Sequence, residues 1–148
     1  MISIIKEALY KFLAEDLGYT VYDGPYDESN REYPYLYLNM SNTVRERRKK
    51  DTVNDIISFK IDIFSLYDGE QEILDMEKTI FDNIDKLYDI DSISYIKQGS
   101  FRILDDKSEG TLKKHGILTY SFFVKGIEEI VEDNVDDDTS NEDNNTAS

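Results

Sequence analysis

The stretch IISFKIDIFSL, residues 56–66, decides the fold class of this chain. Apolar and polar side chains alternate along it, which is the pattern of a strand with one face buried and the other face in water. The apolar members are Ile57, Phe59, Ile61 and Ile63, and the polar members between them are Ser58, Lys60 and Asp62. A strand of this kind needs neighbouring strands and a covering layer over its apolar face.

The segment YPYLYLNM, residues 33–40, predicts the first neighbouring strand. Pro34 lacks a backbone donor, so it belongs at the start of this strand or at a sheet edge. Residues 41–54, between the two strands, are polar and have RERRKKD at their centre. The two strands therefore predict a long β-hairpin with a basic tip.

Two segments with helical spacing are expected to supply the covering layer. Residues 2–17 carry an apolar stripe that ends before Gly18, a residue typical of a helix C-terminus. Asp68 is expected to be the N-cap of the second helix, with Gln71 three residues later as in a capping box. The first stripe is Ile2, Ile5, Leu9, Phe12, Leu13 and Leu17, and the second is Ile73, Met76, Ile80, Ile84 and Leu87.

Three further strands complete the prediction. They are expected over residues 19–22, over residues 93–104 with Gly99 as a bulge, and over residues 115–125, with a turn at 107–110 between the last two. The resulting order is α-β-β-β-α-β-β. It predicts an α+β fold in which a mainly antiparallel sheet of about five strands carries two helices on one face.

Charge and composition divide the chain and limit its function. The formal net charge is −15, and from Ile127 onward there are nine acidic residues and no Lys or Arg. We therefore expect a folded domain over residues 1–130 and a disordered acidic tail over residues 131–148. Strong net negative charge argues against free nucleic acid as the main partner. The N-terminal residues are not expected to be a signal peptide, and no apolar run approaches the roughly 20 residues of a membrane span. We therefore expect a protein assembled in the cytoplasm, with no membrane partner.

A search for catalytic chemistry finds little. The chain has no Cys and a single histidine, His115, which we interpret as a strand-end residue. Asp89 and Asp91, and the run 136–138, lack the spacing of a calcium loop. We therefore expect no catalytic residues, no cofactor and no metal site, and the protein is not expected to be an enzyme.

Two groups of residues are candidates for an interface. The first is the basic cluster, which is either a solvated hairpin tip or a contact with an acidic partner surface or with passing DNA. The second lies on the strand after Glu32, where tyrosines pack in the core or form an interface. The candidates are Arg45, Arg47, Arg48, Lys49 and Lys50 in the first group and Pro34, Tyr35 and Tyr37 in the second.

Over roughly residues 1–126 the chain resembles the tail-terminator, or tail-completion, proteins that join tail to head in long-tailed bacteriophages. Three segments carry the resemblance: the opening helix followed by Val-Tyr-Asp-Gly (21–24), the strand Tyr-Pro-Tyr-Leu (33–36), and Phe-Lys-Ile-Asp-Ile-Phe-Ser (59–65) followed by Gly-Glu-Gln-Glu (69–72). The late strand His-Gly-Ile-Leu (115–118) agrees with the family's glycine-containing last strand.

The resemblance implies a virion structural protein at the head–tail junction. Its α+β protomers would close into a homo-oligomeric ring, expected to be a hexamer, that caps the tail tube and joins it to the neck. The implied partners are the tail-tube protein and a head-closure or neck protein, with DNA only as cargo that passes through the lumen. The family has no catalytic residues.

Two other functions stay open. A different neck component, such as a head-closure protein or connector adaptor, would share the ring but bind the head side. An acidic host-directed regulator, such as a DNA mimic, would explain the charge and the acidic tail.

Overall fold

The computed structural model describes residues 2–23, 31–49, 52–107 and 112–125, and it has the predicted α+β order. Two of its helices, α1 and α2, continue into short turns of a different pitch, η1 and η3. The helical elements are α1 (Ile2–Lys11), the π-helical turn η1 (Phe12–Asp16), α2 (Gln71–Asn83) and the 3₁₀ turn η3 (Ile84–Asp89). The strands are β1 (Val21–Tyr22), β2 (Tyr35–Lys49), β3 (Thr52–Ser65), β4 (Ile93–Asp106) and β5 (Lys113–Lys125).

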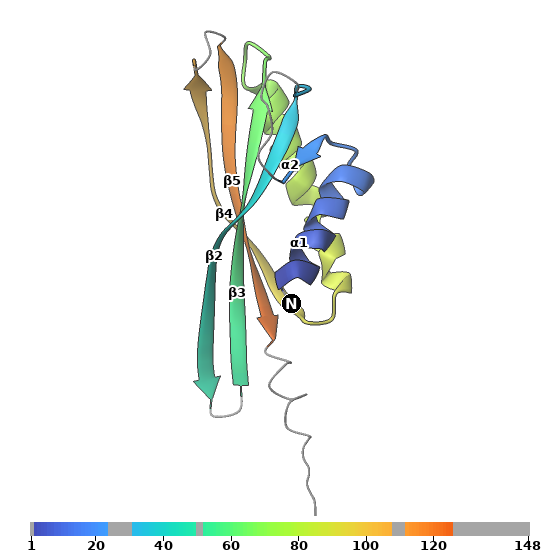
Figure 1. The fold of residues 1–148 in the computed structure, drawn as a ribbon, viewed down its shortest axis with the longest axis vertical. Helices are drawn as coiled ribbons and strands as arrows, with labels where there is room; N and C mark the ends of the chain where they lie inside the picture. Colours follow the sequence, from blue (N-terminus) through green and yellow to red (C-terminus); the bar gives the residue numbers. More distant parts are fainter. Residues whose placement is uncertain (1, 24–30, 50–51, 108–111, 126–148) are drawn as a thin grey trace, which may run out of the picture.

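The five strands form one sheet in the order β1-β2-β3-β5-β4. The short strand β1 pairs in parallel with β2, and the three remaining pairs are antiparallel. Both helices lie on the same side of this long, twisted sheet (Figure 1). The prediction of a mainly antiparallel sheet of about five strands with two helices on one face is therefore confirmed.

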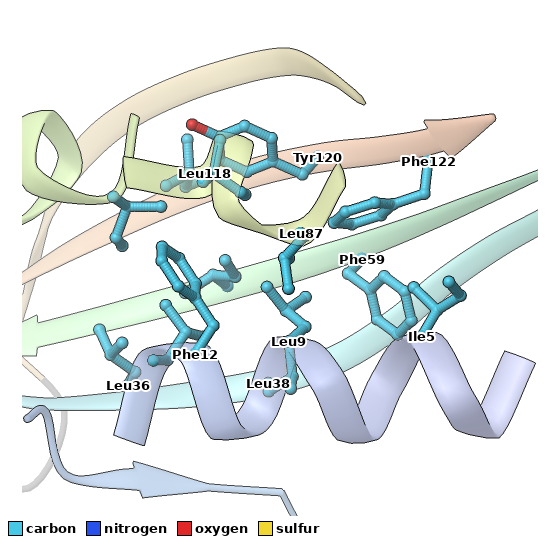
Figure 2. Packing of buried hydrophobic residues seen from close by; sticks show 14 of the residues in the cluster. Ile5, Leu9, Phe12, Leu36, Leu38, Phe59, Leu87, Leu118, Tyr120 and Phe122 are labelled. Carbon is cyan, nitrogen blue, oxygen red and sulfur yellow. The ribbon is translucent and has the colours of Figure 1, made fainter. Parts of the chain in front are cut away.

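The core lies between that face and the helices. Ile57, Phe59, Ile61 and Ile63 of β3 are fully buried in it, which confirms the alternation that the sequence predicted. Side chains from α1 and η1 point toward the same layer from the other side, as Figure 2 shows for Ile5, Leu9 and Phe12. Burying one large aliphatic or aromatic side chain stabilises a protein by about 1.5–3 kcal/mol, so this layer supplies the main driving force for folding.

The first helix changes pitch before it ends. The bond from Leu17 N to Phe12 O, at 3.0 Å, spans five residues and closes a π-helical turn, whereas the sequence predicted one regular helix over 2–17. The wider turn places the neighbours Phe12 and Leu13 together in the core. Gly18 then takes a φ of 77°, which confirms it as the left-handed residue that ends the helix.

The start of the second helix differs from the prediction. Asp68 is not the N-cap; Glu70 precedes the first helical residue and makes no side-chain capping bond. Instead, the Ser65 hydroxyl at the end of β3 donates to the Glu72 carboxylate and accepts a bond of 3.0 Å from the Tyr67 amide. These two bonds tie the first turn of α2 to the end of β3. The predicted apolar stripe of this helix is buried along its whole length.

The hairpin strands β2 and β3 extend well into the polar stretch where the sequence predicted a tip. Backbone pairing continues from Tyr35↔Phe64 to Lys49↔Thr52, with register shifts at Met40/Asn42 and Arg47/Lys49. In β4, the shift between Gln98 and Phe101 confirms the predicted bulge at Gly99. Most of the predicted turn at 107–110 and the whole acidic tail over 131–148 lie outside the described residues.

Candidate interaction surface

The face of the sheet opposite the helices, here called the outer face, carries a row of stacked rings at one end. Tyr35, Phe64 and His115 come from β2, β3 and β5 and stand at neighbouring register positions. The Tyr35 and Phe64 rings are stacked with centroids 4.9 Å apart, and Phe64 stacks on the His115 ring at 4.3 Å. This row holds the three strands together on the side that the helices leave uncovered.

Arg31 covers the end of this row at β2. Its Nη1 donates to the Tyr35 hydroxyl at 2.8 Å, and its guanidinium lies 5.1 Å from the Tyr35 ring centroid. The same guanidinium lies 5.7 Å from the Tyr22 ring and 5.9 Å from the Tyr37 ring. Tyr35 is consequently only 1% exposed although it belongs to the outer face.

Asp62 is a buried acid in the next row of the outer face. Its side chain is 6% exposed, and its Oδ1 lies 2.8 Å from His115 Nε2, with Lys60 Nζ at 3.8 Å from its other oxygen. A carboxylate out of water needs such partners, because burial without hydrogen bonds or opposite charge is costly. His115, the one histidine, therefore has a structural contact that explains its position.

The opposite end of the outer face is more open. The Ser58 and Ser121 hydroxyls hydrogen-bond across β3 and β5 at 2.7 Å, and the Phe123 and Tyr95 rings lie 5.5 Å apart. Tyr95 is 52% exposed and Val44 is 41% exposed. Exposed apolar side chains that gather at one end of a sheet are typical of a protein interaction surface.

Both edges of the sheet are long. Among the described strands, none pairs with the outer edge of β4, and β2 has an outer neighbour only at Leu36 and Tyr37, through β1. Every residue from Met40 to Val44 is exposed. Edge strands of this length present backbone donors and acceptors that can pair with another chain.

A groove of about 550 Å³ lies between the α2–η3 segment and β4. Two exposed aromatic side chains line it from the helix side, Phe81 at 56% and Tyr88 at 37%, and residues 95–98 line it from β4. The Tyr88 hydroxyl accepts a bond of 2.8 Å from the Ile96 amide, so a side chain already occupies this point of the β4 edge.

Tyr120 also lines the groove, and its hydroxyl lies near several carboxylates. Burial raises the pKa of the Tyr120 hydroxyl, and the negative charges of Glu77, Asp85 and Asp82 raise that pKa further. The hydroxyl itself donates to Gln98 Oε1 at 2.9 Å. The groove therefore combines aromatic surface with the Asp85 carboxylate, and Glu77 and Asp82 lie close enough to act on the same hydroxyl.

The predicted interface residues differ in where the structure places them. Tyr35 is buried in the protomer and Tyr37 is half-buried near Arg31, so Tyr35 packs inside the molecule instead of lying on its surface. Pro34 precedes β2 and follows a cis peptide bond, which agrees with its predicted place at the strand start. Of the basic cluster, Arg45, Arg47, Arg48 and Lys49 stand on β2, and Lys50 lies outside the described residues.

The groove was missed in the sequence analysis. Phe81 and Tyr88 fall outside the buried stripe of the second helix, and exposed aromatic residues at such positions are the signal that points to them. Their convergence depends on the packing of η3 against β4.

The residues that the structure describes contain neither a metal cluster nor a membrane-spanning helix. In that part of the chain, no group of three or more His, Asp or Glu side chains is arranged to hold a metal ion. None of the helices described there has the length and apolar character needed to cross a bilayer.

Comparison with protein-family models and with curated proteins finds no match to this chain. Among solved structures, the chain is similar to a protein chain in the virion of a native gene transfer agent particle. The two are 16% identical with a TM-score of 0.47, and the likeness covers 77% of this chain and 84% of that chain.

Proposed function

We propose that this protein is a non-enzymatic virion assembly protein, and that it acts as a ring-forming tail terminator. The observation that carries the proposal is the five-stranded sheet with two long edges. Among the described strands, only the two residues of β1 pair with the outer side of β2, and none pairs with the outer side of β4. The sequence segments that resemble tail terminators support the same role, because they form α1, β1, the start of β2, and β3 with the start of α2.

The exposed strand edges are suited to the formation of a closed ring. A protomer with exposed strand edges can associate with a copy on each side, and a closed ring leaves no copy with an unused contact surface. Capping then follows from differential binding. One face of the ring complements the end of the tail tube, whereas the other does not reproduce the tube end, so no further tube subunit adds.

The charge of the chain suits a conduit for DNA. Six copies would carry a formal charge of about −90, six times the −15 of one chain. A negative lumen repels the phosphate backbone, and DNA would therefore pass without binding tightly. In this proposal the neck protein binds the face of the ring that points away from the tube.

A tube-growth assay tests the proposal. Purified tail-tube protein is polymerised with and without this protein, and tube lengths are measured by electron microscopy. We expect the protein to stop growth and to appear as a ring at tube ends. Unchanged tube lengths, together with binding to filled heads that lack tails, would instead assign the protein to the head side of the neck.

A further inference from the structure

The groove beside β4 has the chemistry of a site for a basic, partly apolar protein segment. Phe81 and Tyr88 supply aromatic surface, and Asp85 supplies a carboxylate in the same lining. An exposed aromatic groove in an otherwise folded domain indicates a binding surface, since isolated proteins rarely leave such patches uncovered. The negative charge beside it selects for cations in the bound segment.

The local cations do not balance this negative charge fully. Lys78 is held by Asp82 at 2.6 Å, and Lys86 is held by Asp16 at 2.8 Å on the first helical segment. Among the described residues that line the groove, Lys97 is the one lysine, and it pairs in register with Ser121 of the outer face. Because Lys78 already offsets Asp82, the carboxylates that make the helix side of the groove negative and favour a cationic ligand are those of Glu77 and Asp85.

One segment of this same chain matches these requirements. Residues 40–49 of β2, here called the β2 arm, include Arg45, Arg47, Arg48 and Lys49, so four of the chain's 17 basic residues lie within five positions. The arm also presents apolar side chains, because Met40 is 46% exposed and Val44 is 41% exposed. Methionine and aliphatic side chains pack favourably on aromatic rings.

The arm cannot fill the groove of its own protomer. β2 and β4 are separated in the sheet by β3 and β5, which at a strand spacing of about 4.8 Å places them roughly 14 Å apart. Figure 1 shows the β2–β3 end running past the helices and past the end of β5, away from its own α2. The arm is thus directed outward, where a second molecule can receive it.

We propose that the β2 arm of one copy docks in the groove between α2–η3 and β4 of the next copy. The inference rests on the proposed ring, and it assigns the two surfaces that make the ring. Because the arm and the groove are different surfaces, the contact is head-to-tail, so each copy uses its arm on one neighbour and its groove on the other. Head-to-tail contacts of this kind add one copy after another until the rotation between neighbouring copies completes a closed ring.

Cysteine cross-linking tests the contact directly, because the natural chain has no Cys. The test variant carries Arg47→Cys on the arm and Asp85→Cys in the groove. The matched control carries Arg47→Cys and Glu7→Cys, which is an exposed residue of α1. After mild oxidation, we expect a non-reducing gel to show a ladder from dimer up to the full ring for the test variant and mainly monomer for the control.

Two outcomes of cross-linking would overturn the inference. A ladder that stops at the dimer would mean a reciprocal contact between two copies, not a head-to-tail one. Equal cross-linking of test and control variants would mean that the arm has no preference for the groove.

Charge reversal provides a second, independent test. Arg47→Glu with Arg48→Glu, or Asp82→Lys with Asp85→Lys, should each weaken ring assembly about tenfold or more, because each places like charges together. All four changes in one chain should restore assembly. The control Glu7→Lys with Glu15→Lys changes net charge by the same amount as the groove variant and should leave assembly unaltered.

The outcomes separate this inference from the proposed function. If the natural chain forms rings or caps tubes while the reversed variants behave like it, the arm–groove contact is wrong and the tail-terminator role stands. If the natural chain neither associates nor caps, the proposed function fails, and this inference fails with it.

Discussion

Gly116 occupies a point where β5 passes directly under the second helix. It pairs with Ile63 of β3 and Ile103 of β4. A Cβ atom at this position would lie 2.7 Å from Cγ2 of Ile73, 3.5 Å from Cβ of Ile63 and 3.6 Å from Cε1 of Phe101. Only the first of these contacts is too short, so Gly116→Ala perturbs the packing of α2 on the sheet specifically.

The size of the effect follows from this geometry. Two carbon atoms pack best at about 3.5–4.0 Å, so Ile73 or the helix that carries it must retreat by roughly 1 Å. Ile73 is fully buried and β-branched, and it has few rotamers through which to move its methyl group. Overpacking of this kind costs about 1–3 kcal/mol, and the lower entropy of the unfolded alanine chain offsets about 0.4–1 kcal/mol of it. We expect a net loss of about 1–2 kcal/mol.

Urea unfolding followed by circular dichroism and tyrosine fluorescence measures this loss. Gly69→Ala is the matched control, because its Cβ would meet a Tyr67 ring carbon at 3.3 Å and that ring is 56% exposed and free to swing away. The control should change stability by less than about 0.5 kcal/mol. Gly116→Ala combined with Ile73→Ala should cost less than the sum of the two single changes. A Gly116→Ala protein as stable as the natural one would refute the packing argument.

Three further outcomes are expected. The raised pKa of Tyr120 in the native state means that the unfolded chain releases this proton first, so the natural protein loses stability as the pH rises above about 10. Tyr120→Phe should reduce this loss. Urea midpoints measured at several alkaline pH values will detect the difference. His115→Leu should cost about 1–3 kcal/mol because it leaves buried Asp62 without its closest partner, and a fully stable variant would contradict that role. Gly99→Ala should destabilise the β4 bulge by about 1 kcal/mol, since the added methyl meets the Thr119 hydroxyl, and Thr119→Ala should remove most of that cost in the same unfolding assay.

Much of the local structure could be predicted because it depends on how apolar side chains repeat along a single strand or helix. The alternation from Ile57 to Ile63 placed β3, and the two apolar stripes placed the helices and their buried faces. Gly18 and Gly99 marked a helix end and a bulge because both are local backbone requirements. The error at Asp68 has the opposite origin. The start of the second helix is tied to the end of β3 by the contact from Ser65 to Glu72, and such a contact joins two elements.

The candidate surface was only partly predictable for the same reason. The basic cluster is a property of the sequence, but its position on a strand edge follows from a hairpin that pairs farther than polarity suggests. Tyr35 is of a residue type that is favoured at interfaces, yet the Phe64 ring and the Arg31 guanidinium pack against it, and it is buried inside the protomer.

By itself, the sequence determined the fold class, the number and kind of elements and the faces they bury, since each follows from the spacing of side chains along a single element. The tertiary structure alone decided the strand order, the buried Asp62–His115 contact and the groove that Phe81 and Tyr88 line. These features join residues that are far apart in the chain. Their positions depend on which strands pair and which helix packs where, and local periodicity carries no information about that.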